Sequence, residues 1–461
     1  MPVIAAYAVP HPPLLVPAVG KGKELEVTET SMALERIAKE IKAIAPELIV
    51  FITPHSVMYA DYFHISPSAK AEGDFSNFGA DDVKISVDYD EVFVNSLSAE
   101  AEKAGIAAGT LGERDNALDQ GCTVPLFFLQ KHYTDFKTVR IAISDMELID
   151  HYNFGRLISV TATKQDKKTI IIASGDLSHK LSESGPYGFV EDGPVFDALV
   201  VDVFKNGTFD KLLDLPELLA ENAAECGLRS FVIMAGSLHK KLIKPKLLSY
   251  EAPFGVGYAV ASFFITGTDE SCDYSEMVKI RQSADINDKK AHEGNYVRYA
   301  RSVVEEYITG GKVPDIPAGL SEEMYEDKAG VFVSIKKTNN LRGCVGTVSP
   351  AYANIAEEIR ANAISAAVGD SRFMPVTAEE LPLLSYSVDV LMDLEPVHDI
   401  SELDAAKYGI IVRNQFKKGL LLPNLDGVET VEKQINIAKQ KAGINPREEF
   451  TISRFEVVRH I

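Results

Sequence analysis

Residues 47–56, ELIVFITPHS, place a histidine directly after a short apolar run. The run follows an amphipathic, helix-like stretch at residues 32–44, MALERIAKEIKAI. Comparable apolar runs occur at residues 3–9, 139–144, 169–175 and 257–267. Short apolar runs that alternate with amphipathic helices are typical of βαβ units, in which the strands of a parallel sheet are buried on both faces. We therefore predict an α/β fold for residues 1–266, with a mostly parallel sheet flanked by helices.

The second half of the chain shows a different order of patterns. Helix-like and strand-like stretches occur there at residues 295–308, 330–337, 353–368, 386–394, 407–423 and 431–444. This mixture predicts a second α/β or α+β domain over residues 280–461. Residues 267–279 are polar and poor in large apolar side chains, so we predict that they form the linker between the two domains.

Composition excludes several classes of partner. The 461 residues carry a formal net charge of −20 at pH 7, which would repel nucleic acid and anionic membrane surfaces, so we expect neither. The N-terminus lacks the basic segment and unbroken apolar core of a signal peptide, and we expect a cytoplasmic protein. The four cysteines form no CxxC pair, which argues against a disulfide framework or a structural zinc knot.

Three histidines closely follow predicted strands, namely His11 in VPHPPLL, His55 in FITPHS and His179 in IIASGDLSH. In an α/β sheet, ligands bind beyond the carboxyl ends of the strands, so side chains from several strand ends converge there. Neutral imidazole is a common transition-metal ligand, and two imidazoles with one anionic ligand leave open positions on Fe(II) for substrate and oxygen. The three histidines therefore predict a shared metal site.

The anionic ligand has three candidates. Glu225 and Cys226, in AAECGLRSF, begin a helix-like stretch, where the helix N-terminus and a bound cation would favour a thiolate. Glu251, in SYEAPFG, is a more distant carboxylate. The residues alone leave all three alternatives open.

The set VPHPPLLVP, ELIVFITPHS, DQGCTVPLFFL, SGDLSH and ECG, in this order, resembles the LigB-type class III extradiol dioxygenases and the related Memo family over nearly all of residues 1–265. The resemblance implies that His11 and His55 are metal ligands and that His179 is the active-site acid or base. The third ligand is a glutamate in the dioxygenases and a cysteine in Memo-like proteins. Cys226 is therefore the first choice and Glu225 the alternative. The implied metal is Fe(2+), with zinc and copper as alternatives.

The same resemblance implies an activity. In these dioxygenases, ferrous iron holds a catecholate and dioxygen together, and the ring opens beside the diol. We accordingly expect a non-haem iron dioxygenase that acts on a catechol-like or other small aromatic substrate. The dioxygenases commonly carry a histidine where this chain has Gln120, which donates a hydrogen bond but exchanges no proton at pH 7. Gln120 and Cys226 favour the alternative, a Memo-type metal-binding or redox protein that does not cleave rings.

The motif LRGCVG in the second half carries its own chemistry. Gly343 and Gly346 would let the backbone approach a ligand closely, and Arg342 would supply a fixed cation. Cys344, beside that cation, would be held as a reactive thiolate in a ligand-binding cleft. His398, in EPVHDI, is a further candidate partner for Cys344.

Residues 280–461 resemble the AMMECR-type domain throughout, in the stretches NNLRGCVGT, DSRFMPVTAEELPLLSYSVDVL and KYGIIVRNQFKKGLLLPNLDGVETVEKQINIAKQKAGI. The resemblance implies a separate C-terminal α+β domain. It also implies an association of Memo-like and AMMECR-type domains with a radical-SAM protein, which we therefore expect as a partner.

Overall fold

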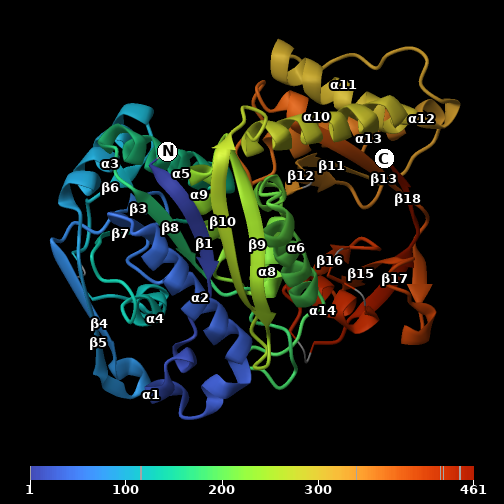
Figure 1. Cartoon of the computed structure of the whole chain (residues 1–461). Helices are drawn as coiled ribbons and strands as arrows, with labels where there is room; N and C mark the ends of the chain where they lie inside the picture. Colours follow the sequence, from blue (N-terminus) through green and yellow to red (C-terminus); the bar gives the residue numbers. More distant parts are fainter. Residues whose placement is uncertain (1, 115–116, 339, 426, 429, 446–447) are drawn as a thin grey trace. The chain divides into compact units, whose positions relative to one another are not determined.

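The computed structural model describes residues 2–114, 117–338, 340–425, 427–428, 430–445 and 448–461. The chain forms two compact units, Met1–Lys279 (unit 1) and Ile280–Ile461 (unit 2) (Figure 1). None of the helices in the described part of the chain has the length and apolarity needed to cross a membrane.

The centre of unit 1 is a six-stranded sheet with the strand order β7-β2-β8-β1-β10-β9. Its strands are β1 (Val3–Val9), β2 (Leu48–Thr53), β7 (Lys137–Ala142), β8 (Thr169–Ser174), β9 (Lys241–Glu251) and β10 (Tyr258–Thr268). β7, β2, β8 and β1 run parallel to one another, whereas β10 and β9 are antiparallel to their neighbours. This arrangement confirms the predicted α/β fold with a mostly parallel sheet.

Helices cover both faces of this sheet (Figure 1). Ahead of β9, the described residues form the helices α1 (Pro17–Gly20), α2 (Thr28–Ile44), α3 (Glu91–Ala104), α4 (Gln120–Leu129), α5 (Leu148–Gln165), α6 (Asp192–Asn206), α7 (Asp210–Leu213), α8 (Glu217–Ala223) and α9 (Leu228–Ser237). Consecutive side chains of a strand point to opposite faces. On β2, Ile49 and Phe51 therefore pack with α2 and α4, whereas Val50 and Ile52 pack with α3, α5, α6 and α9.

A helix, α10 (Tyr274–His292), contains the boundary between the units. The segment predicted as a linker, residues 267–279, consequently holds the last residues of β10 and the first turns of α10. Tyr274 is buried in the core of unit 1, where its ring centroid lies 5.6 Å from that of Phe209. Most of the other α10 side chains are exposed, which accounts for the polar composition of this stretch.

The described residues of unit 2 form two four-stranded antiparallel sheets, with the orders β12-β11-β13-β18 (the first sheet) and β14-β17-β15-β16 (the second sheet). The strands are β11 (Val331–Lys337), β12 (Asn340–Gly346), β13 (Leu384–Leu391), β14 (Glu395–Val397), β15 (Gly409–Arg413), β16 (Lys418–Leu421), β17 (Thr451–Phe455) and β18 (Val457–His460). The helices are α11 (Asn295–Gly310), α12 (Glu322–Glu326), α13 (Ile355–Val368) and α14 (Val431–Ala442). These elements confirm the expected separate α+β domain.

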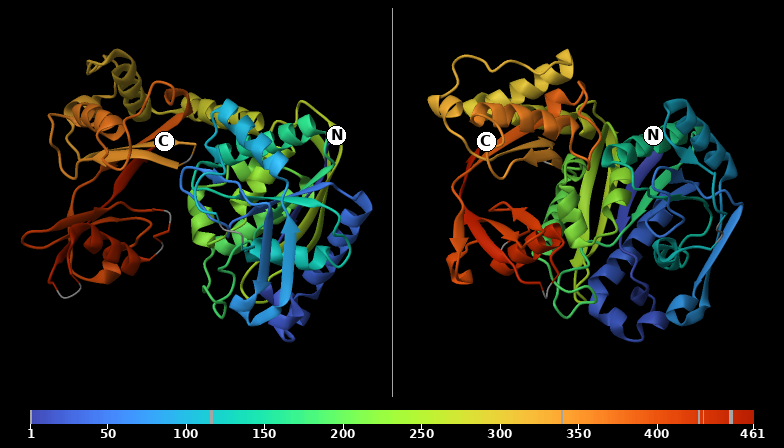
Figure 2. Two further views of the ribbon diagram at one scale, coloured as in Figure 1. Left: turned by 90° about the vertical axis from the view of Figure 1, so that its left-hand side faces the viewer. Right: turned by 180° about the vertical axis from the view of Figure 1, so that it is seen from behind.

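Each sheet of unit 2 has its own core. α11 and α13 lie on one face of the first sheet (Figure 2). They pack there against side chains such as Val333 and Val388. α14 packs on the second sheet, where Ile410 and Val412 of β15 meet Ile435 and its neighbours on the helix.

Candidate metal centre

Three adjacent parallel strands end at the same edge of the unit 1 sheet. β8 lies between β1 and β2, and the three run in the same direction. His11, His55 and Asp176 each lie two residues beyond the end of their strand, β1, β2 and β8 respectively. The strand order therefore brings together side chains that are up to 165 positions apart in sequence.

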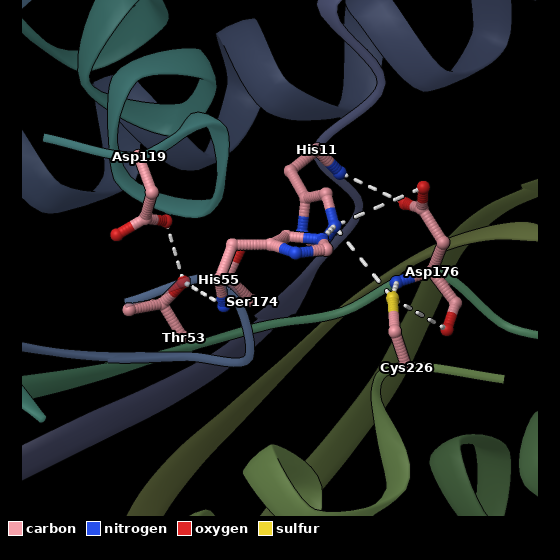
Figure 3. Close-up of polar contacts among 7 residues, drawn as sticks. All are labelled: His11, Thr53, His55, Asp119, Ser174, Asp176 and Cys226. Carbon is pink, nitrogen blue, oxygen red and sulfur yellow. Dashed lines mark hydrogen bonds and ion pairs between the residues drawn. The ribbon is translucent and has the colours of Figure 1, made fainter. Parts of the chain in front are cut away.

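His11 lies at the middle of the resulting cluster (Figure 3). Its Nε2 lies 2.9 Å from the Nε2 of His55 and 3.6 Å from the Sγ of Cys226. On the other side of the ring, Nδ1 lies 2.9 Å from the hydroxyl oxygen of Ser174, which keeps Nε2 directed at the other two side chains. His11 is 2% exposed, whereas His55 is exposed, so solvent reaches the cluster from the His55 side.

Cys226 lies in the short connection between α8 and α9. Its sulfur accepts a hydrogen bond from the backbone N–H of Asp176 at 3.2 Å, which ties this connection to the end of β8. The potential ligand atoms of His11, His55 and Cys226 all lie within 4.8 Å of one another. The structure thus brings together the two histidines and the cysteine that the sequence singled out.

The two distances from Nε2 of His11 suit a single transition-metal ion bound by all three side chains. Nitrogen ligands about 2.0–2.1 Å and a sulfur ligand about 2.3 Å from one ion are about 2.9–3.6 Å apart when they subtend 90–110°. The observed separations of 2.9 and 3.6 Å fall in this range. Two imidazoles and one thiolate would leave further positions on the ion open for small molecules.

Burial controls the protonation of the three side chains. It lowers the pKa of His11 to about 4, and it also lowers the pKa of His55, with a further contribution from the neighbouring His11. Both imidazoles are therefore neutral at pH 7, which is the form that binds metal. Burial raises the pKa of the Cys226 thiol well above its usual value, and the carboxylate of Asp176 raises it further. A bound cation is the counter-charge that would hold this sulfur as a thiolate.

Asp176 and His179 lie beside Cys226 and form a second group with it, in which the potential ligand atoms are within 4.8 Å of one another. Asp176 also accepts a hydrogen bond from the backbone N–H of His11 at 2.9 Å, and burial raises its pKa to about 6. The Nδ1 atom of His179 is buried and has no hydrogen-bond partner among the residues that the structure describes. Asp176 was not among the predicted site residues, although it is the aspartate of the SGDLSH motif.

The carboxylates of the two glutamate candidates, Glu225 and Glu251, form hydrogen bonds outside the cluster of His11, His55 and Cys226. Glu225 accepts a hydrogen bond from the backbone N–H of Leu228 at 2.6 Å, at the N-terminus of α9, and burial raises its pKa to about 7. Glu251, at the end of β9, accepts two hydrogen bonds of 2.6 Å from the backbone and hydroxyl of Thr30. Of the three candidates for the anionic ligand, Cys226 is the one whose ligand atom groups with both histidines in the described part of the chain.

Gln120 is the first residue of α4 and is half-buried. Its neighbour Asp119 is linked to the cluster by hydrogen bonds. The Asp119 carboxylate accepts a 2.6 Å hydrogen bond from the hydroxyl of Thr53. The Thr53 oxygen in turn accepts a hydrogen bond from the backbone N–H of His55 at 3.2 Å (Figure 3). Asp119 therefore supports the loop that carries His55, a role that no sequence pattern had indicated.

In unit 2, Arg342 is not the cation that the sequence suggested for Cys344. Its guanidinium forms a bidentate pair with Glu380, at 2.9 and 3.0 Å. Cys344 lies instead beside Arg372, whose Nη2 is 3.4 Å from the Cys344 carbonyl oxygen, and its backbone N–H donates to Asp370 at 2.9 Å. The expected role of Arg342 is corrected accordingly, because a nearby carboxylate neutralises its charge.

The two glycines of this motif contact the protein itself. A Cβ atom on Gly343 would lie 2.1 Å from the carbonyl oxygen of Ala366 in α13, and one on Gly346 would lie 2.2 Å from the ring of Phe332. Both glycines thus permit close packing of β12, rather than the approach of a ligand. His398 is exposed and follows β14 in the second sheet, whereas Cys344 lies on β12 in the first sheet.

Comparisons with known families match each unit separately. The family model described as the catalytic LigB subunit of aromatic ring-opening dioxygenase matches residues 5–261, and the AMMECR1 family model matches residues 297–460. The Clostridium acetobutylicum protein CA_C1420 is 39% identical over 462 residues, which cover 98% of each chain. A Thermotoga maritima protein is 48% identical over 167 residues, or 36% of this chain and 96% of the relative.

Two solved structures also show similarity to parts of the chain. The uncharacterized protein PH0010 from Pyrococcus horikoshii is 32% identical, with a TM-score of 0.34, and the match covers 36% of this chain and 88% of that one. The uncharacterized protein JW3007 from Escherichia coli is 13% identical, with a TM-score of 0.39, and the match covers 56% of this chain and 99% of that one.

Proposed function

Because the chain belongs to the family of the catalytic LigB subunit of aromatic ring-opening dioxygenases, with an AMMECR1 domain after it, we propose that unit 1 is a metal-dependent oxygenase. Its metal would be held by His11, His55 and Cys226, with Fe(2+) as the first choice and zinc or copper as alternatives. The proposed substrate is a catechol-like or other small aromatic molecule. The observation that carries the proposal is the set of two neutral imidazoles and one thiol within 4.8 Å of one another, open to solvent at His55.

When bound, ferrous iron would supply a coordination sphere that holds and polarises an aromatic diol and dioxygen together. The protein contributes the orientation of the ligands. Ser174 directs the ring of His11, and the chain from Asp119 through Thr53 supports the loop of His55. These supports reduce the freedom of both imidazoles, which favours a defined geometry at the ion.

We assign proton transfer to His179. Its position in the group with Asp176 and Cys226 supports this assignment, as does its Nδ1, which is buried and lacks a hydrogen-bond partner within the described residues. The imidazole would accept a proton from a substrate hydroxyl and return it later. The carboxylate of Asp176 nearby would stabilise the imidazolium that forms in between.

A second candidate function is favoured by Cys226 and Gln120. A thiolate in place of a carboxylate, and an amide in place of an imidazole, suit a metal-binding or redox protein that does not open rings. In this case the AMMECR1 domain and the metal centre would serve a radical-SAM partner enzyme. The two candidates differ in one measurable property, since only the oxygenase consumes dioxygen when an aromatic substrate is added.

The test starts from protein purified anaerobically and loaded with ferrous iron. We expect about one iron per chain and oxygen uptake that depends on one or more members of a panel of catechols. A His11→Ala variant is the metal-free control, and His179→Ala should keep its iron but turn over about 100- to 10,000-fold more slowly. Bound iron without oxygen uptake on any diol would contradict the oxygenase and favour the second candidate.

A further inference from the structure

The first sheet of unit 2 buries one face in a core, and part of its other face carries small polar side chains. Val333 and Ile335 of β11 pack into the core with α11 and α13. Ser334, between them, points to the opposite face because side chains alternate along a strand. Its cross-strand partners are Cys344 on β12 and Ser387 on β13, and its hydroxyl donates to the sulfur of Cys344 at 3.2 Å.

A cavity of about 1110 Å³ lies over this polar face, and we call it the sheet cavity. Its floor includes the three side chains named above, and its walls come from the end of α10, the loop at residues 370–372, and the region of β16 and α14. Small-molecule sites in proteins usually measure about 300–1,000 Å³. The sheet cavity therefore has room for a molecule the size of a metabolite together with some water.

The charge of the lining indicates what the cavity prefers. Six lysine and arginine side chains and four aspartate and glutamate side chains line it, so the formal side-chain charge of the lining is +2, whereas that of the whole chain is −20. Arg372 is paired with Asp370, with its Nη2 2.6 Å from the carboxylate. Lys336 and Lys441, in contrast, are exposed and have no ion pair within 4.0 Å among the described side chains. These two lysines are available to an anion from outside.

The same cavity offers apolar surface. Phe332 and Leu341 from the first sheet, with Leu420 and Leu422 from the region of β16, line it together with the charged groups. Leu341 is 41% exposed, so its side chain is accessible to a ligand in the cavity. A ligand that satisfies both sets of groups carries a negative charge and an apolar body.

We propose that the sheet cavity of unit 2 is a binding site for a small organic anion with an apolar body, with its charge at Lys336 and Lys441 and Cys344 in the wall beside it. The class includes aromatic carboxylates, sulfonates and phosphate esters. The site is independent of the metal centre in unit 1, so failure of either proposal leaves the other standing.

A matched pair of fluorescent molecules tests the preference for an anion. 8-Anilinonaphthalene-1-sulfonate carries an apolar body and a sulfonate, and N-phenyl-1-naphthylamine has nearly the same body without the charge. We expect the full-length protein to bind the sulfonate more tightly. Raising the salt concentration from about 0.05 M to about 0.5 M should weaken the binding of the sulfonate, because salt screens charge. The binding of the neutral amine should stay nearly unchanged.

Alkylation of Cys344 tests where the sulfonate binds. The native protein is treated with iodoacetamide, and the labelling of each cysteine peptide is followed by mass spectrometry. We expect the sulfonate to slow the labelling of Cys344 but not of Cys272, a partly exposed cysteine of unit 1 that serves as the internal control.

Two double variants test the assigned lysines. The double variant Lys336→Gln, Lys441→Gln should bind the sulfonate about three- to tenfold more weakly, as expected for the loss of two exposed charges. Its affinity for the neutral amine should not change. The control variant Lys312→Gln, Lys328→Gln removes two exposed lysines of unit 2 that do not line the cavity. It should bind the sulfonate and the neutral amine as tightly as the wild type does. The proposal is overturned if both molecules bind equally at low salt, or if bound sulfonate leaves Cys344 labelling unchanged. Labelling of Cys344 that requires denaturant would overturn it as well, since the thiol would then not face the cavity.

Discussion

Ser174 and Asp176, two residues apart at the end of β8, both hold His11. Ser174 holds the Nδ1 atom, and Asp176 accepts the backbone N–H. One strand end thereby fixes both the ring and the main chain of a residue that comes from another strand. This arrangement explains why Nε2 of His11 points at the cluster.

At the same scale, the identity of the third ligand can be tested by comparing neighbours. Cys226→Ser should lose most of its bound metal, because the sulfur faces the histidines. Glu225→Gln should lose little, because its carboxylate is directed at the backbone of Leu228. Metal content after loading and desalting, measured by mass spectrometry on both variants and on His11→Ala, checks the prediction. Greater loss in Glu225→Gln would reverse the assignment.

Asp197 on α6 provides a pH prediction that does not involve the metal ligands. Its carboxylate accepts hydrogen bonds from the backbone N–H of Ser178 at 2.8 Å and from the hydroxyl of Tyr250 at 2.7 Å. Burial nevertheless raises its pKa to about 6, above the unfolded value of about 3.9. A raised carboxyl pKa means that the folded state favours the protonated form. The stability that this gives is present below pH 4 and is lost as the pH rises through 6.

Asp197→Asn should remove this pH dependence of stability, because asparagine does not titrate, while its amide can still form hydrogen bonds with Ser178 and Tyr250. Relative to the wild type, the variant should therefore gain on the order of 2–3 kcal/mol in free energy of unfolding between pH 4 and pH 8, since one pKa unit is worth about 1.4 kcal/mol. Urea unfolding of unit 1 at both pH values, in the presence of a chelator, gives the measurement. A difference between variant and wild type that is the same at both pH values would contradict it.

At the scale of elements, Gly343 is the position at which β12 packs closely against α13. The carbonyl oxygen of Ala366 would lie 2.1 Å from an added Cβ atom, and neither a strand nor a helix backbone moves easily. Gly343→Ala should therefore destabilise unit 2 by about 1–3 kcal/mol, the usual cost of overpacking. Gly310, at the end of α11, has open space around it, so Gly310→Ala is a matched control that should be neutral or slightly stabilising.

Thermal or denaturant unfolding of both glycine variants checks this prediction. Equal stability of Gly343→Ala and the wild type would mean that β12 and α13 can move apart enough to accept the added Cβ atom. In that case the glycine would have to be explained by something other than packing.

At the scale of the whole molecule, the two units have separate cores and separate sheets. We expect two unfolding transitions in the full chain. A fragment of residues 280–461 should unfold at the same midpoint as one of them, because the core of unit 2 is built from its own residues. Calorimetry of the full chain and the fragment tests this. A single transition shared by both units, or a fragment that does not fold, would show that the units depend on each other.

Much of this architecture could be predicted from local patterns. The apolar runs at residues 3–9, 48–53 and 169–174 are strands β1, β2 and β8, and the stretch at residues 32–44 lies within α2. Such elements can be recognised because burial on one or both faces leaves a periodic trace in the sequence. The histidines that follow β1 and β2 were recognisable for the same reason, since parallel strands deliver their ends to one edge.

Only the tertiary structure decided which neighbouring side chains face each other. Glu225 and Cys226 are adjacent in the sequence, yet one points to the start of α9 and the other to His11, 215 positions away. Arg342 likewise finds Glu380 rather than Cys344, and Gly343 meets a helix rather than a ligand. Periodicity reports whether a residue is buried, but not which distant residue it meets. That choice depends on strand order and on the packing of helices over the sheet, which are properties of the folded chain as a whole.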